Sequence, residues 1–457
     1  MASASLKRSR TAGSTKTKFT LSMWFKRSSV DAKYLAVNYT SDSNRALIQF
    51  GGADNLIFQS KYSNSNNAQI ETNRKFRDTS GWYHIVLIGD STLATAADRT
   101  KLYVNGVRET SFSQETQISQ DGNYYFNEAT TNGFRIGEKG DGSDFFDGCM
   151  SHVVFLDGVA AAHTDFGSFD STTGIWKATS SPSVTYGTNG FFLKFDNSAN
   201  MGLDSSGQSN NLTTTGTIIQ TKDTPTNVFT TLNPLRILGT ANASLTKVAT
   251  QYNTTSNSWG NITSTLAFSK GKYYAEFKFA ALQSSSGYGG MGITDAQEAY
   301  NANDNLVNNS ATSAGVRGDY RSGQSKLVSA ASVVSSNIGN FSNGDIIGLA
   351  ADMDNKALYV HLNGTYYQVG GVTGVPTSGA SKTGALTIPA TCVDCIFFVA
   401  SYTSDAVIVA NFGNGYFGTT AVTSAENPDD GIGIFEYDVP AGYRALCTTS
   451  LNATEYS

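Results

Sequence analysis

The amino-acid sequence predicts an all-β fold built from two consecutive antiparallel sandwiches. Charged residues make up only 15% of the 457 residues, against roughly 25% in typical soluble proteins. The 26 Phe and 22 Tyr residues supply bulk for packing, and 45 Gly residues supply turns. Short apolar-alternating runs separated by Gly, Asn, Asp and Ser recur along the chain, as expected for many short strands. The absence of long runs of helix-forming residues argues against a mainly helical protein.

The first half contains the clearest strand patterns. In residues 18–26, Phe19, Leu21, Met23 and Phe25 alternate with Thr20, Ser22, Trp24 and Lys26, so we expect one face of this strand to lie on a core. Asn105 and Gly106 form the dipeptide typical of a two-residue hairpin turn. The other strands predicted here are residues 82–88, 101–104, 134–137, 150–156 and 191–195.

A polar stretch separates this half from a second β region. The pattern along the whole chain predicts four parts: a sandwich over residues 1–195, a connector rich in Asn, Ser and Thr over 196–240, a second sandwich over 241–422 and a tail segment over 423–457. Asn363 and Gly364 repeat the hairpin-turn dipeptide. The strands predicted in the second sandwich are residues 268–279, 345–352, 357–362, 396–402 and 406–412.

Several blocks of the first half resemble, in order, laminin-G-like domains of the concanavalin A type, which are jelly-roll sandwiches. These blocks are FTLSMWFK (19–26), WYHIV (82–86), KLYVNG (101–106) and FDG (146–148). Further blocks resemble structural proteins of marine tailed bacteriophages: FRD (76–78), FLDG (155–158), DFG (165–167), TGIW (173–176), YGTNGF (186–191), DSSG (204–207) and DTPTN (223–227). The resemblance therefore implies a concanavalin A-like, laminin-G-like sandwich in a phage virion protein.

The second half resembles a SPRY domain, another concanavalin A-like sandwich. The matching blocks are GKYYAEF (271–277), GDIIG (344–348) with the turn at 363–364, and VANFG (409–413). Ala275 departs from this pattern, because many SPRY domains carry Trp at that place. The block PAGYRALCTT (440–449) is similar to a tail segment of such phage proteins.

Net charge and hydropathy argue against some classes of binding partner. The net charge of −5 argues against nucleic acid, because phosphate binding needs a clustered basic face. No apolar run is long enough to span a membrane. The basic residues before Lys18 are not followed by the apolar core of a secretory signal. We therefore expect assembly in the host cytoplasm, exposure on the particle surface and no membrane insertion.

The sequence contains none of the common catalytic motifs. The four histidines are far apart in sequence, and neither a nucleophile elbow nor a phosphate-binding loop occurs. No run of carboxylates on alternate strand positions matches the acid and nucleophile of a glycosidase. We therefore predict that the protein is not an enzyme and carries no organic cofactor.

Two kinds of binding residue stand out. Asp141, Asp144 and Asp147 lie in a Gly-rich loop, and oxygen ligands from a flexible loop suit calcium; solvated acidic turns are the alternative. Aromatic rings near loops could stack on the apolar faces of sugars, with ordinary packing as the alternative. These candidates for a glycan site are Tyr124, Tyr125, Tyr288, Tyr300 and Tyr320.

Cys392 and Cys395 form a CxxC motif that lacks the second ligand pair of a structural zinc site. Two loop thiols or a local disulfide are the readings left open.

Three functions are compatible with the sequence. The first is a non-enzymatic virion protein (tail fibre, head fibre or decoration subunit) that contacts other virion proteins, forms a homo-oligomer and contributes to host attachment. The second is a lectin-like adhesin module that binds a host cell-surface glycan. The third is a glycan depolymerase, supported only by the range of activities found on the fold.

Overall fold

The computed structural model describes residues 4–11, 15–239, 243–282, 288–298, 306–319, 325–336 and 338–455. By internal contacts the chain divides into two compact units, Met1–Gln220 (unit 1) and Thr221–Ser457 (unit 2). Among the described residues, all strand pairs but β21–β36 are antiparallel. The fold class expected from the sequence is confirmed.

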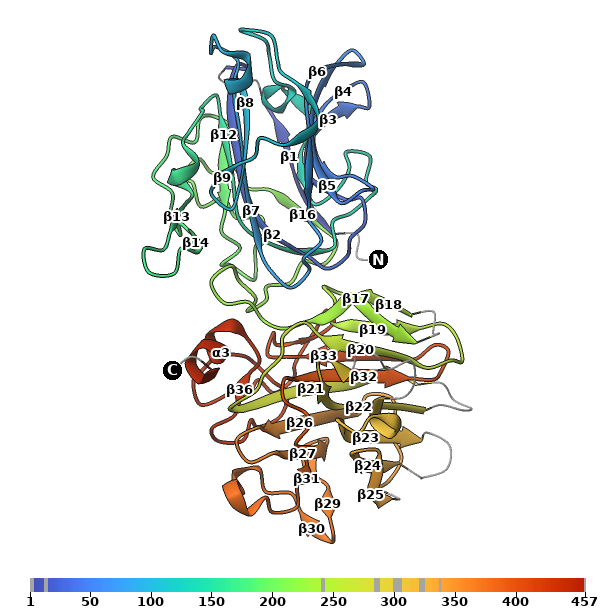
Figure 1. Ribbon diagram of the computed structural model, residues 1–457. Coiled ribbons are helices and arrows are strands. Elements are labelled where there is room, and N and C mark those ends of the chain that lie inside the picture. Colours follow the sequence, from blue (N-terminus) through green and yellow to red (C-terminus); the bar gives the residue numbers. More distant parts are fainter. Residues whose placement is uncertain are drawn as a thin grey trace. The chain divides into compact units, whose positions relative to one another are not determined.

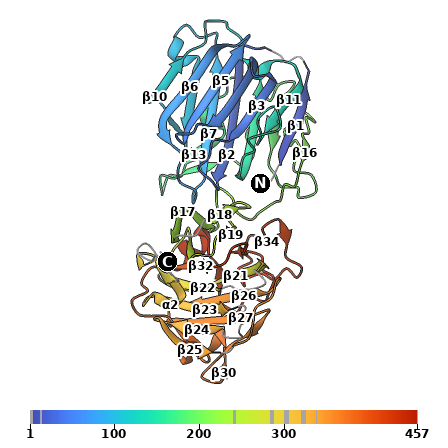
Figure 2. The same ribbon diagram turned by 90° about the vertical axis from the view of Figure 1, so that its right-hand side faces the viewer.

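Unit 1 is a two-layer sandwich (Figure 1, Figure 2). An eight-stranded sheet has the order β10 (Phe112–Thr116), β6 (Ser65–Lys75), β5 (Asn55–Tyr62), β4 (Asn44–Phe50), β3 (Tyr34–Ser41), β11 (Thr130–Ile136), β1 (Ser5–Arg10), β16 (Thr213–Thr215). A six-stranded sheet has the order β15 (Phe191–Leu193), β12 (Gly148–Asp157), β2 (Lys18–Arg27), β7 (Tyr83–Asp90), β8 (Thr100–Val104), β9 (Val107–Arg108). A hairpin of β13 (Gly167–Phe169) and β14 (Trp176–Ala178) stands apart, as do 3-10 turns at Ala96–Asp98, Tyr125–Asn127 and His163–Asp165.

Strand β2 confirms the predicted inward face and corrects the expectation for its other face. Phe19, Leu21, Met23 and Phe25 lie in the core between the two sheets, as their alternation predicts. The opposite face is also buried, with Trp24 only 4% exposed. Residues 159–186 cover this outer face, so β2 is apolar or internally hydrogen-bonded on both sides. The covering segment lies far along the chain, and the local pattern does not reveal it.

Unit 2 is also a sandwich (Figure 1). Its seven-stranded sheet has the order β17 (Leu232–Gly239), β20 (Gly260–Ser264), β32 (Cys395–Ser401), β22 (Tyr288–Asp295), β23 (Ala314–Asp319), β24 (Lys326–Ser329), β25 (Ser332–Ser336). The facing sheet has the order β18 (Ala243–Thr246), β19 (Gln251–Thr254), β33 (Val407–Asn411), β21 (Lys272–Ala281), β26 (Ile346–Asp352), β27 (Ala357–Leu362), β28 (Thr365–Tyr366), with β31 (Leu386–Thr387) on β27 and β36 (Arg444–Ala445) on β21. Smaller elements are β29 (Gln368–Val369), β30 (Val372–Thr373), β34 (Tyr416–Phe417), β35 (Thr420–Ala421), a 3-10 turn at Pro376–Ser381 and the helices α2 (Leu306–Asn309) and α3 (Thr448–Glu455).

The expected face of β21 is confirmed, because Tyr273, Ala275, Phe277 and Phe279 all lie in the core between the two sheets of unit 2. No candidate membrane span was found, since none of the described helices combines the necessary length with an apolar composition.

The segment expected to be a connector is shared between the two units. Leu212 enters the core of unit 1, and β16 pairs with β1. Further along, β17 pairs with β20 in unit 2. The segment expected to be a tail packs on β21 through β36, and Phe229 forms a bridge with Cys447. In each unit, residues near its start therefore pair with residues near its end.

The hairpin turn between β8 and β9 adopts the predicted left-handed conformation, with φ of 48° at Asn105 and 77° at Gly106. The side-chain Oδ1 of Asn105 also accepts a hydrogen bond of 2.8 Å from the backbone N–H of His84. Two stabilising terms therefore meet at this asparagine: its tolerance of positive φ and its hydrogen bond.

We expect Asn105→Ala to lower the free energy of unfolding of unit 1 by about 2 kcal/mol, since alanine both strains the turn and loses the acceptor. Asn105→Gly is the matched control, because glycine relieves the strain and loses only the hydrogen bond, a cost of about 1 kcal/mol. Urea unfolding of both variants measures the difference. Equal losses in the two variants would show that the backbone conformation contributes nothing.

Candidate functional site

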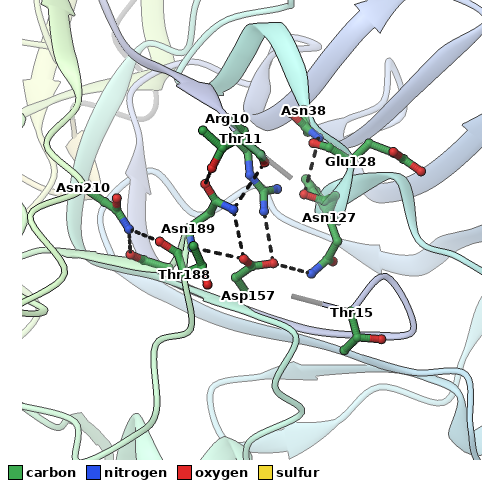
Figure 3. A network of polar contacts seen from close by, with 12 residues as sticks. Arg10, Thr11, Thr15, Asn38, Asn127, Glu128, Asp157, Thr188, Asn189 and Asn210 are labelled. Carbon is green, nitrogen blue, oxygen red and sulfur yellow. Dashed lines mark hydrogen bonds and ion pairs between the residues drawn. The ribbon is translucent and has the colours of Figure 1, made fainter. Parts of the chain in front are cut away.

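A buried polar network joins the ends of β1 and β12 in unit 1 (Figure 3). Asp157, at the end of β12, accepts hydrogen bonds from Arg10 Nη2 at 3.3 Å and Asn127 Nδ2 at 2.8 Å on one oxygen. Its other oxygen accepts from the backbone N and Nδ2 of Asn189, at 3.0 and 3.1 Å. Burial lowers the pKa of Arg10 to about 10, against the opposing effect of Asp157. Arg10 and Asp157 therefore form a buried ion pair.

A second buried carboxylate lies in the DSSG block. Asp204 accepts hydrogen bonds from the backbone N of Phe192 at 2.9 Å and of Asn210 at 2.8 Å. It also accepts from both the backbone N and the hydroxyl of Ser206. One polar residue of each of the phage-like blocks FLDG, YGTNGF and DSSG (Asp157, Asn189 and Asp204) is therefore engaged inside the fold.

A Ser–His pair lies beneath the β13–β14 hairpin but lacks the geometry for nucleophilic catalysis. His84 stacks on Trp24, with ring centroids 4.6 Å apart. Its Nδ1 accepts the indole N–H of Trp176 at 2.8 Å, so the proton of the neutral ring is on Nε2, which lies 2.9 Å from the hydroxyl of Ser22. Nε2 therefore donates to Ser22 and cannot take its proton. Burial lowers the pKa of His84 to about 3.

A buried chain of hydrogen bonds holds residues 436–437 in unit 2. The backbone N–H of Gly364 donates to His361 Nδ1 at 3.1 Å, which places the ring proton on Nε2, 2.7 Å from the hydroxyl of Tyr274. Tyr274 in turn donates to Glu276 at 3.1 Å. Glu276 also accepts the backbone N–H groups of Glu436 and Tyr437. Burial raises the pKa of Glu276 to about 7.

The acidic loop does not bring its three aspartates together as a metal site. Asp141 accepts a hydrogen bond from Ser143 and forms an ion pair with Lys139 at 2.8 Å, and these contacts hold its pKa below the usual range. The backbone carbonyls of Asp144 and Asp147 accept hydrogen bonds from the neighbouring strands. Across the described residues, no group of three or more His, Cys, Asp or Glu side chains could hold a metal ion.

The structure contradicts a solvent-facing role for two of the aromatic candidates. Tyr124 is fully buried, meets Phe19 edge to face and donates its hydroxyl to the carbonyl of Arg99. Tyr125 is 6% exposed and donates its hydroxyl to Thr40. Their rings pack inward from the 3-10 turn, although the polar residues around them suggested a loop. Tyr300 and Tyr320 lie outside the described residues.

Cys392 and Cys395 form a disulfide, one of the two readings left open, and both are fully buried. Cys149 and Cys447 are not part of this disulfide.

Tyr288 belongs to a row of planar side chains on the outer face of the seven-stranded sheet of unit 2. The ring of Tyr402 lies 5.4 Å from that of Trp259 and 6.3 Å from that of Tyr288, and the rings of Trp259 and Tyr288 lie 6.4 Å apart, so the three form a compact cluster. The guanidinium of Arg317 lies 4.8 Å from the centroid of Tyr288. The four residues, named here the aromatic row, come from four neighbouring strands or their ends, in the order β20, β32, β22, β23. Tyr402 is 37% exposed and the other three are partly exposed.

Strand register explains how the aromatic row forms. Met291 and Ile293 of β22 face the core, so the even-numbered Tyr288 and Gly290 face outward. Gly290 is directly opposite Arg317 in the β22–β23 pair, and the guanidinium reaches Tyr288 diagonally, while the side chain of Val307 in α2 packs over Gly290. Tyr402 follows the outward series of Ile396, Phe398 and Ala400 in β32. This outward parity is the signal by which the sequence could have indicated Tyr402.

A second cation lies next to the aromatic row. Lys326 of β24 is directly opposite Arg317 in the register, and the core position of the adjacent Leu327 places it on the same outer face. In the described part of unit 2, neither cation forms an ion pair with a carboxylate. The buried Nε of Arg317 has no hydrogen-bond partner there.

Comparison with known proteins agrees with this architecture. Residues 3–164 match the family model of the concanavalin A-like lectin/glucanases superfamily, in its laminin G form. Unit 1 therefore carries a concanavalin A-like, laminin-G-like domain. No curated protein matches the sequence.

Solved structures with a similar fold share little sequence with this chain. The SPRY domain of human HERC1 is 12% identical, with a TM-score of 0.30, and the match covers 39% of this chain and 96% of that domain. The PSpry domain of TRIM65 is 12% identical, with a TM-score of 0.28 and coverage of 40% and 91%. The native heptameric SAP-like pentraxin from Limulus polyphemus is 16% identical, with a TM-score of 0.25 and coverage of 35% and 73%.

Proposed function

We propose that this chain is a non-enzymatic structural protein of a tailed-bacteriophage particle (a tail fibre, head fibre or decoration subunit) that contributes to attachment at the host surface. The proposal rests on where the fold places polar residues of the phage-like sequence blocks. Asp157, Asn189 and Asp204, three polar residues of these blocks, are buried and engaged in hydrogen bonds within unit 1, whereas Arg77 and Asp78 of the FRD block are exposed. Residues used in this way specify a sandwich and its connections, which suits a structural protein.

The chemistry of the buried titratable groups supports the absence of catalysis. In the Ser22–His84 pair the ring donates to the hydroxyl, which leaves no base for the serine. Glu276 is buried and already accepts hydrogen bonds from the backbone and from Tyr274. A catalytic acid or base must reach a substrate proton, and these groups face the interior.

A lectin-like, glycan-binding module is the second candidate function. The aromatic row favours it, because partly exposed rings side by side with a cation offer both stacking and a charged contact. Such a module also fits within the first proposal, since a virion protein exposed on the particle meets the host envelope. The particle would hold several copies, in contact with one another and with other virion proteins.

Mass spectrometry of purified particles tests the proposed function. Particles of the phage that carries this gene are banded on a density gradient and digested. We expect peptides from both units at a fixed ratio above one copy per particle, measured against the major capsid protein. A phage replication protein serves as the control and should be lost in the gradient. Recovery of the chain only from the lysate supernatant would refute virion membership.

A further inference from the structure

We propose that the aromatic row of unit 2, together with Lys326, is a binding site for an acidic, uronate-bearing polysaccharide. The proposal deepens the proposed function and rests on it, because it names the ligand class through which attachment would occur. The site lies in the SPRY-like unit, on the outer face of a sheet.

Ring geometry supports a saccharide. The rings of Trp259, Tyr402 and Tyr288 form a compact cluster, with centroid distances of 5.4, 6.3 and 6.4 Å, so one sugar residue can contact more than one of them. Sugar rings present apolar C–H faces that pack on aromatic rings, while their hydroxyls need polar groups at the edge. Position on neighbouring strands holds the rings in a fixed register, which reduces the ordering cost of binding.

Charge determines the kind of saccharide. Arg317 and Lys326 are adjacent on the same face, and in the described part of unit 2 neither forms an ion pair. The Nε–H of Arg317 is buried without a partner, and buried donors normally have one. A planar guanidinium suits a carboxylate in particular, through two parallel hydrogen bonds. An acidic sugar therefore complements the site better than a neutral one.

Single-stranded nucleic acid also stacks on aromatic rings, but the charge of this protein disfavours it. Such ligands need a positively charged groove that follows the backbone over several nucleotides. The row has two cations, and the chain as a whole carries a net charge of −5. A polymer with one carboxylate per sugar and an apolar ring face is the better match, and an oligonucleotide becomes an outcome of the test.

The test is equilibrium binding of the full-length chain to polygalacturonate and alginate, both uronate polymers, to dextran as the neutral polymer and to oligo-dT. We expect binding to the uronate polymers and at least tenfold weaker binding to dextran and oligo-dT. Tyr402→Ala should weaken uronate binding about tenfold, since it removes the most exposed ring. Arg317→Gln should abolish the preference for uronate over dextran, because it removes the charge.

Phe169→Ala is the matched control, because Phe169 is an aromatic residue of unit 1 that is 52% exposed. Its binding should equal that of the unchanged chain, and thermal unfolding of each variant confirms that it folds. If the unchanged chain fails to bind either uronate polymer, or binds oligo-dT as tightly, the ligand class is wrong. If Tyr402→Ala binds the uronate polymers as tightly as the unchanged chain, the proposed position of the site is wrong. Neither result alters the particle mass spectrometry, which tests virion membership separately.

Discussion

Replacement of Asp157 by alanine is expected to lower the free energy of unfolding of unit 1 by about 3–5 kcal/mol. The side chains of Arg10 and Asp157 are at most 1% exposed, so the substitution leaves a cation in the interior without its counter-charge. It also removes the acceptor for Asn127 and for two N–H groups of Asn189. Both losses fall on the same buried cluster, and for that reason the cost is well above that of a typical surface change.

Urea unfolding followed by tryptophan fluorescence measures this loss, because three of the four tryptophans (Trp24, Trp82 and Trp176) lie in unit 1. Asp98→Ala is the control, since Asp98 forms a partly exposed ion pair with Arg108, and it should change stability by less than about 1 kcal/mol. Adding Arg10→Met to Asp157→Ala should restore part of the loss, because it removes the stranded charge. If the double variant is less stable than Asp157→Ala, the unpaired charge of Arg10 is not the cause of the loss.

Acid is expected to destabilise unit 1 by about 4 kcal/mol between pH 6.5 and pH 3, through His84. Burial lowers the pKa of His84 from 6.5 to about 3 in the folded chain. Between these values the unfolded chain binds a proton at this residue and the folded chain does not, so stability is lost as the pH falls. The pKa values of His152 and Asp90 are also lowered, which adds to the loss in the same direction.

Urea unfolding at pH 7 and pH 4 measures the effect, and about 3 kcal/mol of the loss through His84 should be present at pH 4. His84→Gln is the matched variant, because an amide can keep contacts to Trp176 and Ser22 without titrating. Its stability should fall less between the two pH values. An unchanged fall would assign the acid sensitivity to other groups. In unit 2 the raised pKa of Glu276 acts in the opposite sense, since stability there is lost as the pH rises towards 7.

Features with local causes were predictable from the sequence. The turn at Asn363–Gly364 adopts positive φ at both residues, as the dipeptide requires. The core face of β21 follows directly from period-2 alternation. Both depend on neighbouring residues alone, and therefore a single sequence indicates them.

Features formed by distant segments were not predictable. Trp259 and Tyr402 are more than 140 positions apart in the printed sequence and meet only because β20 and β32 are neighbours in the sheet. The buried outer face of β2 depends on a covering segment that follows β12. Tyr124 and Tyr125 lie near an expected loop, yet the start of the 3-10 turn Tyr125–Asn127 carries both rings into the core. The order of strands in the sheets and the turns of the chain determine these positions, and local composition predicts neither.

The pairing of early with late residues in each unit sets the order in which the protein can fold during synthesis. Chains leave the ribosome from the N-terminus, and domains fold as units. Unit 1 is complete once β16 emerges to pair with β1. Unit 2 must wait for β36 to reach β21 and for Cys447 to reach Phe229. Until then the β21 residues that β36 pairs with remain uncovered, so unit 2 is most exposed to misassembly before β36 is synthesised.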